Sequence, residues 1–109
     1  MQIYIAGRID KTEECKDRFA AVEVKILEAG HTPYNPITLG TGYSRKFHLD
    51  HALKKLAECD AVYLMEGSYD DAVARLEADY AELTGLPMFH ETTGGGYWAG
   101  LPRFQGGEE

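Results

Sequence analysis

The sequence lacks any apolar stretch near the ~20 residues of a membrane-spanning helix, and no charged-then-apolar signal sequence opens it. Positive charge is also scarce, because 11 Lys and Arg residues stand against 18 acidic residues and leave a formal net charge of −7. DNA and RNA polymers need a basic surface that displaces counterions. These absences predict a protein that binds neither membranes nor nucleic-acid polymers, but they leave room for a single nucleotide held by backbone amides.

Cysteine is scarce as well. Cys15 and Cys59 fall in separate helical patterns, which favours two buried reduced thiols over a disulfide and predicts a cytoplasmic protein. Cys15 has no histidine signature beside it, so a thiol nucleophile is not expected. No Gly-x-Gly stands at the first turn, and no dinucleotide fingerprint can be assigned. His48 and His51 are two residues without a convincing third ligand, so we expect a solvated helix end, no metal and no cofactor.

The middle of the chain contains a strand–turn–helix unit around which the other segments are arranged. Residues 61–65 form a short apolar run, typical of a strand covered on both faces. Gly67 and Ser68 allow the backbone to turn, and Asp70 or Asp71 can cap the helix that follows. Ligands of open parallel sheets bind at the carboxyl ends of strands, against helix N-termini. We therefore expect this turn to border a binding crevice.

The helix after this turn ends at Gly85, and its apolar spacing predicts a buried stripe. The expected members of the stripe are Val73, Leu76, Tyr80 and Leu83. Glu77 stands about two turns into the helix, on the flank of that stripe and within reach of the crevice. Partial desolvation there is expected to raise the pKa of its carboxyl group and to sharpen its reactivity.

Further strands are predicted over residues 3–6, 31–34 and 86–89. One helix follows a capping-box-like pair, Asp10 and Glu13, and ends at Gly30. Its buried stripe is expected to be Cys15, Phe19, Val22, Ile26 and Ala29. Another helix has Ser44 as its N-cap, and the residues expected to face inward are Leu49, Leu53, Leu56 and Ala57.

Alternating strands and helices in a chain of 109 residues predict one α/β domain, a three-layer sandwich of the flavodoxin or Rossmann kind. A short parallel sheet of four to five strands would lie between the helices. We expect this domain to cover residues 1–90, and residues 91–109 to form a Gly-rich link and an aromatic tail. The tail contains Tyr97 and Trp98, and is too apolar to stay free of this subunit or a neighbouring one.

Several segments, taken in order from residue 1 to about residue 89, resemble one family. They are the opening Ile-Tyr-Ile-Ala-Gly, Gly30 and His31 before Asn35 and Pro36, the run Cys-Asp-Ala-Val-Tyr-Leu from Cys59, and Ala-Arg-Leu-Glu up to Glu77 with Gly-Leu-Pro from Gly85. The family is a small, largely uncharacterised group of bacterial and phage domains. It is related to nucleoside 2-deoxyribosyltransferases and 2′-deoxynucleoside 5′-phosphate N-hydrolases.

The resemblance implies N-glycosidic bond cleavage or deoxyribosyl transfer on a nucleoside or nucleotide, in a homo-oligomer of two or more subunits. In the characterised relatives a glutamate on the helix after the central strand is the nucleophile. An acidic or hydroxyl residue six positions before it helps to hold the substrate, and Glu77 and Asp71 match that spacing. Glycosidic cleavage builds positive charge on the anomeric carbon, which a carboxylate can stabilise or attack. Asp71 could protonate the base or orient the sugar.

Both acids could instead have purely structural roles. Glu77 could be a helix-surface acid paired with Lys or Arg, and Asp71 could act only as a helix cap.

Other substrate-binding candidates border the same crevice. Gly7 permits close backbone approach to a ligand, and Arg8 could grip a phosphate, as the corresponding loop of the N-hydrolases does. Ser68 could add a phosphate contact. Tyr4 points either into the core or at the sugar, depending on strand register. The alternatives are a surface ion pair for Arg8 and a plain turn residue for Ser68.

One position departs from the family pattern. The relatives place a sugar-binding aspartate eight residues before the aspartate that opens the central strand, and this chain has Ala52 there. Asp50 lies roughly 200° away around the helix, so it can substitute only if the helix start shifts. A non-catalytic nucleotide-binding or sensing domain is therefore the alternative function. A subunit that mainly serves assembly through its aromatic tail is a third.

Overall fold

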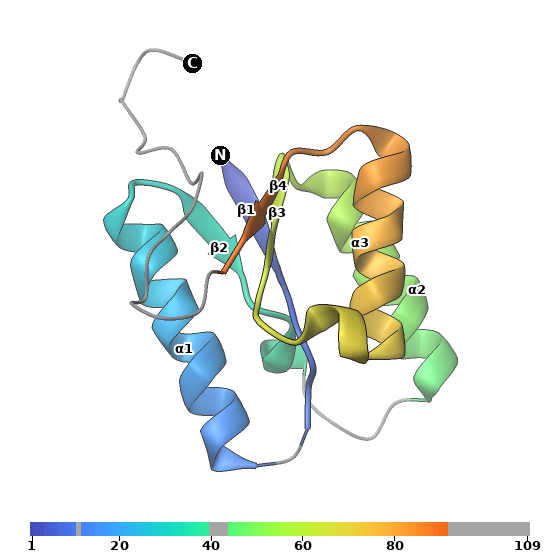
Figure 1. Ribbon diagram of the computed structural model, residues 1–109, viewed down its shortest axis with the longest axis horizontal. Helices are drawn as coiled ribbons and strands as arrows, with labels where there is room; N and C mark the ends of the chain where they lie inside the picture. The colour runs from blue at the N-terminus through green and yellow to red at the C-terminus, as the bar shows by residue number, and fades with distance from the viewer. Residues whose placement is uncertain (11, 40–43, 92–109) are drawn as a thin grey trace.

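The computed structural model describes residues 1–10, 12–39 and 44–91, which contain a parallel four-stranded sheet with the strand order β2-β1-β3-β4. Its strands are β1 (Gln2–Ala6), β2 (Thr32–Tyr34), β3 (Ala61–Leu64) and β4 (Met88–His90). Figure 1 shows this sheet with helices between successive strands, which confirms the predicted α/β class. The predicted tail lies outside the described residues.

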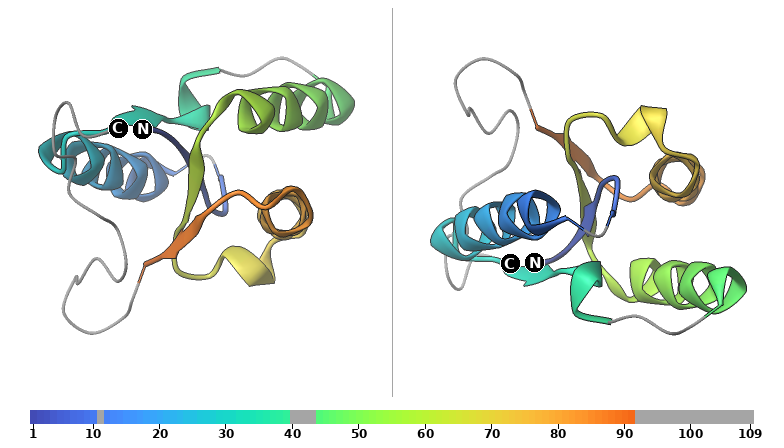
Figure 2. Two further views of the ribbon diagram at one scale, coloured as in Figure 1. Left: turned by 90° about the horizontal axis from the view of Figure 1, so that it is seen from above. Right: turned by 90° about the horizontal axis from the view of Figure 1, so that it is seen from below.

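Three helices complete the three predicted layers. They are α1 (Glu13–Glu28), α2 (Arg45–Glu58) and α3 (Ala72–Thr84), with short 3-10 turns η1 (Pro36–Leu39) and η2 (Ser68–Asp70). The views along the sheet in Figure 2 place α1 on one face and both α2 and α3 on the other. No helix among the described residues is long and apolar enough to cross a membrane.

The central strand β1 divides the core into two halves. Ile3 and Ile5 point toward α1, whereas Tyr4 and Ala6 point toward α2 and α3, because successive side chains of a strand alternate between its faces. All four side chains are fully buried. A strand covered on both faces reads as a continuous apolar run, as β1 and β3 do.

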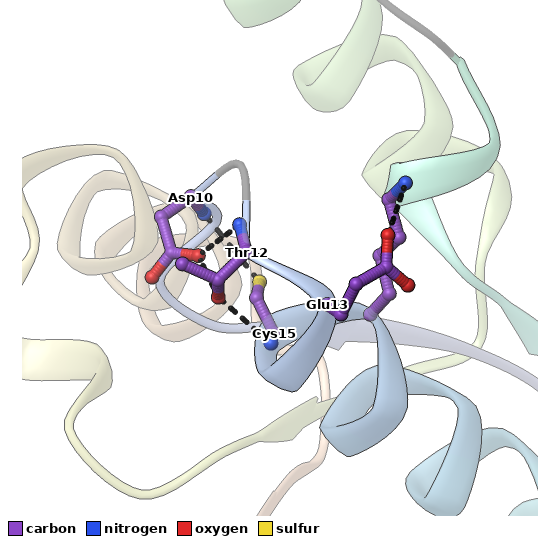
Figure 3. A network of polar contacts seen from close by, with 5 residues as sticks. Asp10, Thr12, Glu13 and Cys15 are labelled. Atoms are coloured by element: carbon purple, nitrogen blue, oxygen red, sulfur yellow. Dashed lines mark hydrogen bonds and ion pairs between the residues drawn. The ribbon is translucent and has the colours of Figure 1, made fainter.

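The first helix begins differently from the prediction. Its N-cap is Thr12, whose hydroxyl accepts from the Cys15 amide at 3.1 Å, and not Asp10. Figure 3 shows that Asp10 instead accepts from the backbone amide of Thr12, at 2.9 Å, and from its hydroxyl. A cap needs its side-chain oxygen near the N2 or N3 amide, and Thr12 lies in register for this. The predicted inward residues from Cys15 to Ile26 are confirmed.

The predicted buried stripe of α3 is wrong. The residues that α3 buries are Ala74, Glu77, Ala78 and Ala81, whereas Leu76 is 41% exposed and Leu83 is 86% exposed. Small alanines allow the helix to lie close to the sheet, and this packing outweighs the apolar spacing. Similarly, α2 buries Ala52 against the sheet, while Ala57, predicted to face inward, is exposed.

The carboxyl ends of β1 and β3 lie side by side, because these strands pair in register from Ile3 with Ala61 to Ala6 with Leu64. This is the point at which the strand order switches sides, because β2 lies on one side of β1, and β3 and β4 lie on the other. Such a switch point is where open α/β sheets bind ligands. The predicted site therefore has the expected place in the fold.

Candidate functional site

A buried tyrosine–glutamate pair joins the central strand to α3. The Tyr4 hydroxyl donates to Oε2 of Glu77 at 2.5 Å, although 73 residues separate them in the sequence. Tyr4 is fully buried, and Glu77 is only 4% exposed. Of the two directions expected for Tyr4, the structure shows the one into the core, where its hydroxyl meets Glu77.

Burial sets the electrostatics of this pair. Removal from water raises the pKa of Glu77 to about 7, the hydrogen bond from Tyr4 opposes this rise, and the negative charge of Asp71 adds to it. Burial and the neighbouring Glu77 charge raise the pKa of Tyr4 as well, so its hydroxyl keeps its proton. Among the described residues no cation forms an ion pair with Glu77. A surface ion pair is therefore not its role in this structure.

Asp71 is the N-cap of α3. Its side chain accepts from the Ala74 amide at 3.0 Å, and its backbone is extended as an N-cap requires. This settles the choice between Asp70 and Asp71 for the cap. Its charge also acts on the pKa of Glu77. The structure therefore gives Asp71 the capping role, with a small electrostatic effect on Glu77.

The turn before α3 is fixed to the end of β1. Gly67 has φ of +84°, a left-handed conformation that glycine adopts without strain. Ser68 is buried, and its hydroxyl donates to the carbonyls of Met65, at 2.5 Å, and Ala6, at 3.3 Å. The hydroxyl proton is therefore used by the backbone, and Ser68 serves here as a turn residue.

The loop after β1 holds Gly7 and Arg8. A Cβ added to Gly7 would lie 3.0 Å from Sδ of Met65 and 3.2 Å from Cζ of Phe19, so any larger residue would press on these two side chains. Arg8 is exposed, and its carbonyl accepts from the Cys15 thiol at 3.6 Å. Its guanidinium forms no ion pair with any described residue, although its charge helps to lower the pKa of the neighbouring Asp10.

The structure separates Asp50 from this group. Asp50 lies on the exposed face of α2 and pairs with Nζ of Lys46 at 2.7 Å. Ala52 occupies the inward position, 8% exposed, in the half of the core that contains Tyr4. No shift of the helix start places Asp50 inward, because Ser44 caps α2 as predicted.

Tyr34 and His51 were not singled out as site residues by the sequence. The ring of Tyr34 stacks on Tyr4 with centroids 5.5 Å apart, and its hydroxyl lies 2.9 Å from Nε2 of His51. The pairing of β1 with β2 could have revealed Tyr34, because Tyr4 and Tyr34 are direct neighbours on these strands and face the same side of the sheet. Aromatic side chains therefore extend from the Tyr4–Glu77 pair toward α2.

His51 contacts two aromatic side chains. The ring of His51 stacks on Phe47, with centroids 6.1 Å apart, besides its contact with Tyr34. Within the described part of the chain, no three His, Cys, Asp or Glu side chains gather closely enough to hold a metal ion.

Comparison with known families gives one match. Residues 1–90 match the sequence model of a family described as a domain of unknown function (DUF4406). None of the curated proteins matches the chain.

Comparison with solved structures finds the same fold in two 2-deoxyribosyltransferases. The one from Bacillus psychrosaccharolyticus is 21% identical with a TM-score of 0.69, and the match covers 86% of this chain and 75% of that one. The one from Leishmania mexicana is 19% identical with a TM-score of 0.68, over 85% of this chain and 65% of that one, just under two thirds of its length. At such identities the likeness establishes the Rossmann-like fold alone.

Proposed function

The chain belongs to the family described as a domain of unknown function (DUF4406), and from its fold and site we propose that it cleaves the N-glycosidic bond of a nucleoside or nucleotide. The sugar would pass to water or to a second base, and Glu77 would be the nucleophile. The fold shared with two 2-deoxyribosyltransferases supports a reaction on deoxyribosyl groups. The proposal includes a small-molecule substrate, no cofactor, and a cytoplasmic homo-oligomer.

The observation that carries this proposal is the burial of the Glu77 carboxyl group without a cation. Burying an acid costs free energy unless a partner compensates it, and one tyrosine hydroxyl compensates only part. A residue with a purely structural role at this position would be better served by an apolar side chain. Acids with strongly raised pKa values at the ligand-binding edge of a sheet are typical of catalytic sites.

The proposed reaction has two steps. First, a carboxylate oxygen of Glu77 bonds to the anomeric carbon while the bond to the base nitrogen breaks, and its electron pair leaves with the base. The base takes up a proton from solvent or from Asp71 in its protonated form. Water or a second base then attacks the same carbon and gives its proton to the Asp71 carboxylate or to solvent, while the ester bond breaks and its electron pair returns to Glu77. Tyr4 holds the carboxylate in place throughout.

Substrate binding falls to the loops at the same edge. Arg8 would hold a phosphate or another anionic group of the substrate through its planar fork, and Gly7, which is buried, would let the loop backbone beside Arg8 come close to the substrate. The N-terminus of α3 at Asp71 adds amide groups and a favourable dipole. Ser68 and Gly67 shape the turn that brings these parts together.

A non-catalytic nucleotide-binding domain is the second candidate. It is favoured by one observation, that Ala52 rather than an acid faces inward beside Tyr4. A domain of this kind would still bind its ligand but would not turn it over. Ligand binding without product would then raise the melting temperature, since binding to the folded state stabilises it.

The test is release of free base from a panel of 2′-deoxynucleosides and their 5′-monophosphates, followed by chromatography. We expect release by the wild type and a loss of at least about 100-fold in Glu77→Gln. The matched control is Glu14→Gln, an exposed glutamate in the first turn of α1, which should keep full activity. Ligand-induced stabilisation without any base release, even at high enzyme concentration, would instead establish the binding domain.

A further inference from the structure

Another tyrosine lies against the Tyr4–Glu77 pair on the side of the edge strand. Tyr34 ends β2, which is the outermost strand beside β1. The ring of Tyr34 lies on the ring of Tyr4, with 5.5 Å between the centroids and 23° between the planes. Tyr34 is half-buried whereas Tyr4 is fully buried, so Tyr34 stands between Tyr4 and the solvent along this edge of the sheet.

Tyr34 is in turn held from α2. Its hydroxyl oxygen lies 2.9 Å from Nε2 of His51, a hydrogen-bond distance, and Nζ of Lys55 lies 5.5 Å from the centre of its ring. The ring of His51 stacks on Phe47, one helical turn earlier, with 6.1 Å between the centroids and 13° between the planes. The place of Tyr34 is therefore set by contacts with α2 as well as by the three residues of its own strand.

The hydrogen bond from Tyr4 to Glu77 depends on the exact place of the Tyr4 ring. The bond is 2.5 Å long, and the strength of a hydrogen bond falls steeply as its distance and angle change. The hydroxyl stands at the far end of the ring, so a small tilt of the ring displaces the oxygen most. Functional groups keep their geometry to within about 0.5 Å when residues behind them lock their rotamers by packing and hydrogen bonds. The ring of Tyr34 gives Tyr4 such packing.

The charged groups around Tyr34 differ from those around Glu77. Burial raises the pKa of Tyr34, and the groups of α2 and its C-cap that also act on it are Lys55, Cys59 and Glu58. The pKa of Glu77 instead responds to burial, to the hydrogen bond from Tyr4 and to the charge of Asp71. No titratable residue belongs to both sets, so an effect of Tyr34 on Glu77 has to pass through its contact with Tyr4.

We propose that Tyr34 and His51, here called the supporting pair, are positioning residues for Glu77 and act on it through Tyr4. Tyr34 holds the ring of Tyr4 where its hydroxyl reaches Oε2 of Glu77, and His51 holds Tyr34 against that ring. The inference deepens the proposed function, and its rate measurement rests on that function. The titration of Glu77 does not, so the two can fail separately.

The first experiment follows the titration of the Glu77 carboxyl carbon by NMR in the full chain, which requires no turnover. His51→Phe keeps a ring against Phe47 but removes the nitrogen, and Tyr34→Phe keeps the stack on Tyr4 but removes the hydroxyl. Each variant should raise the titration midpoint by about 0.5 pH unit, because a displaced Tyr4 hydroxyl stabilises the carboxylate less. The double variant should show no further rise, since both substitutions remove the same contact.

The same titration in a Tyr4→Phe background tests the route of the effect. If the supporting pair acts through the Tyr4 hydroxyl, His51→Phe leaves the midpoint of Glu77 unchanged once that hydroxyl is absent. The matched control is His90→Phe at the opposite edge strand, whose ring stacks on Tyr69 and should have no effect in either background. An unchanged or lowered midpoint in His51→Phe alone, or the same rise in both backgrounds, overturns the proposal.

The second experiment separates substrate binding from the chemical step in base release. His51→Phe should lower kcat by about tenfold and leave KM within about twofold, because it displaces the nucleophile without touching the substrate. A raised KM with an unchanged kcat would mean that the supporting pair contacts the substrate, and it overturns the positioning role. If the wild type releases no base, the proposed function fails, and the titration of Glu77 alone decides this inference.

Discussion

The Tyr4 hydroxyl and the Glu77 carboxyl group share a hydrogen bond of 2.5 Å between the central strand and α3. The two side chains lie in a part of the core from which water is nearly excluded. A charge on Glu77 is therefore stabilised by the Tyr4 hydroxyl and destabilised by burial and by the negative charge of Asp71. The net effect is a pKa of about 7 for Glu77. The stability of the fold and the reactivity of this carboxylate should therefore both depend on pH near neutrality.

Glu77→Gln is expected to stabilise the fold at neutral and alkaline pH. The pKa of Glu77 is raised from its ordinary value of 4.5 to about 7 in the folded state. The folded state thus keeps a proton that the unfolded chain releases, and stability is lost as pH rises through this window. Above it, removing the charge should raise the free energy of unfolding by about 3 kcal/mol. Urea unfolding at a series of pH values measures the difference.

This difference between wild type and Glu77→Gln should vanish below pH 4.5, where the glutamate is protonated in both states. Glu14→Gln, exposed on α1, is the control for the loss of one surface charge. A gain that stays constant from acid to alkaline pH would contradict the raised pKa.

Tyr4→Phe is expected to shift the pH profile of base release to higher pH. The hydrogen bond from Tyr4 is the contribution that lowers the pKa of Glu77, so without it the nucleophile ionises later. The rate should rise with pH in both proteins, because only the ionised carboxylate attacks. The lost hydroxyl should also cost about 1–3 kcal/mol of stability. Initial rates across a pH series test this, and a profile displaced to lower pH would show that Tyr4 does not support the carboxylate.

The layers of this fold could be predicted from the sequence because each strand and helix has its own local signal. Short apolar runs gave the strands, and the capping residues Ser44 and Asp71 fixed the starts of α2 and α3. The first helix was misplaced at its start because Thr12 and Asp10 both offer a capping oxygen, and only the backbone path decides between them.

The buried face of α3 could not be read from apolar spacing. The leucines of that helix form a stripe of the correct period, yet alanines face the sheet. Periodicity shows which side chains share one face of a helix, but which face packs on the sheet depends on how closely the two layers approach. The same limit applied to Tyr34, whose place beside Tyr4 follows from strand register and not from the sequence of either strand.

Substitutions at Asp71 should separate capping from chemistry. Asp71→Asn keeps a side-chain oxygen for the Ala74 amide and should unfold within a few tenths of a kcal/mol of the wild type, whereas Asp71→Ala should lose about 1 kcal/mol. Both remove the negative charge that raises the pKa of Glu77, so both should shift the pH profile of base release downward. At alkaline pH, where Glu77 is ionised in the wild type and in both variants, activity in Asp71→Asn then measures the proton-donor role. Full activity would leave Asp71 only as a cap.

The two glycines at the site should respond to substitution in opposite ways. At Gly7 the obstacle is space, because a Cβ would meet Met65 and Phe19, so the cost should grow with size, from about 1–3 kcal/mol in Gly7→Ala to more in Gly7→Asn. At Gly67 a Cβ would meet nothing, and the obstacle is φ of +84°. Asparagine tolerates this conformation better than alanine, so Gly67→Asn should be the milder change.

Thermal unfolding of the four glycine variants separates these causes, and base release then shows what each glycine does for function. If Gly7→Ala keeps wild-type stability but loses activity, the backbone at Gly7 is needed for close approach of the substrate. A loss of stability with normal activity in the remaining folded protein would instead assign Gly7 to the packing of Met65 and Phe19, which is the result the distances of 3.0 and 3.2 Å lead us to expect.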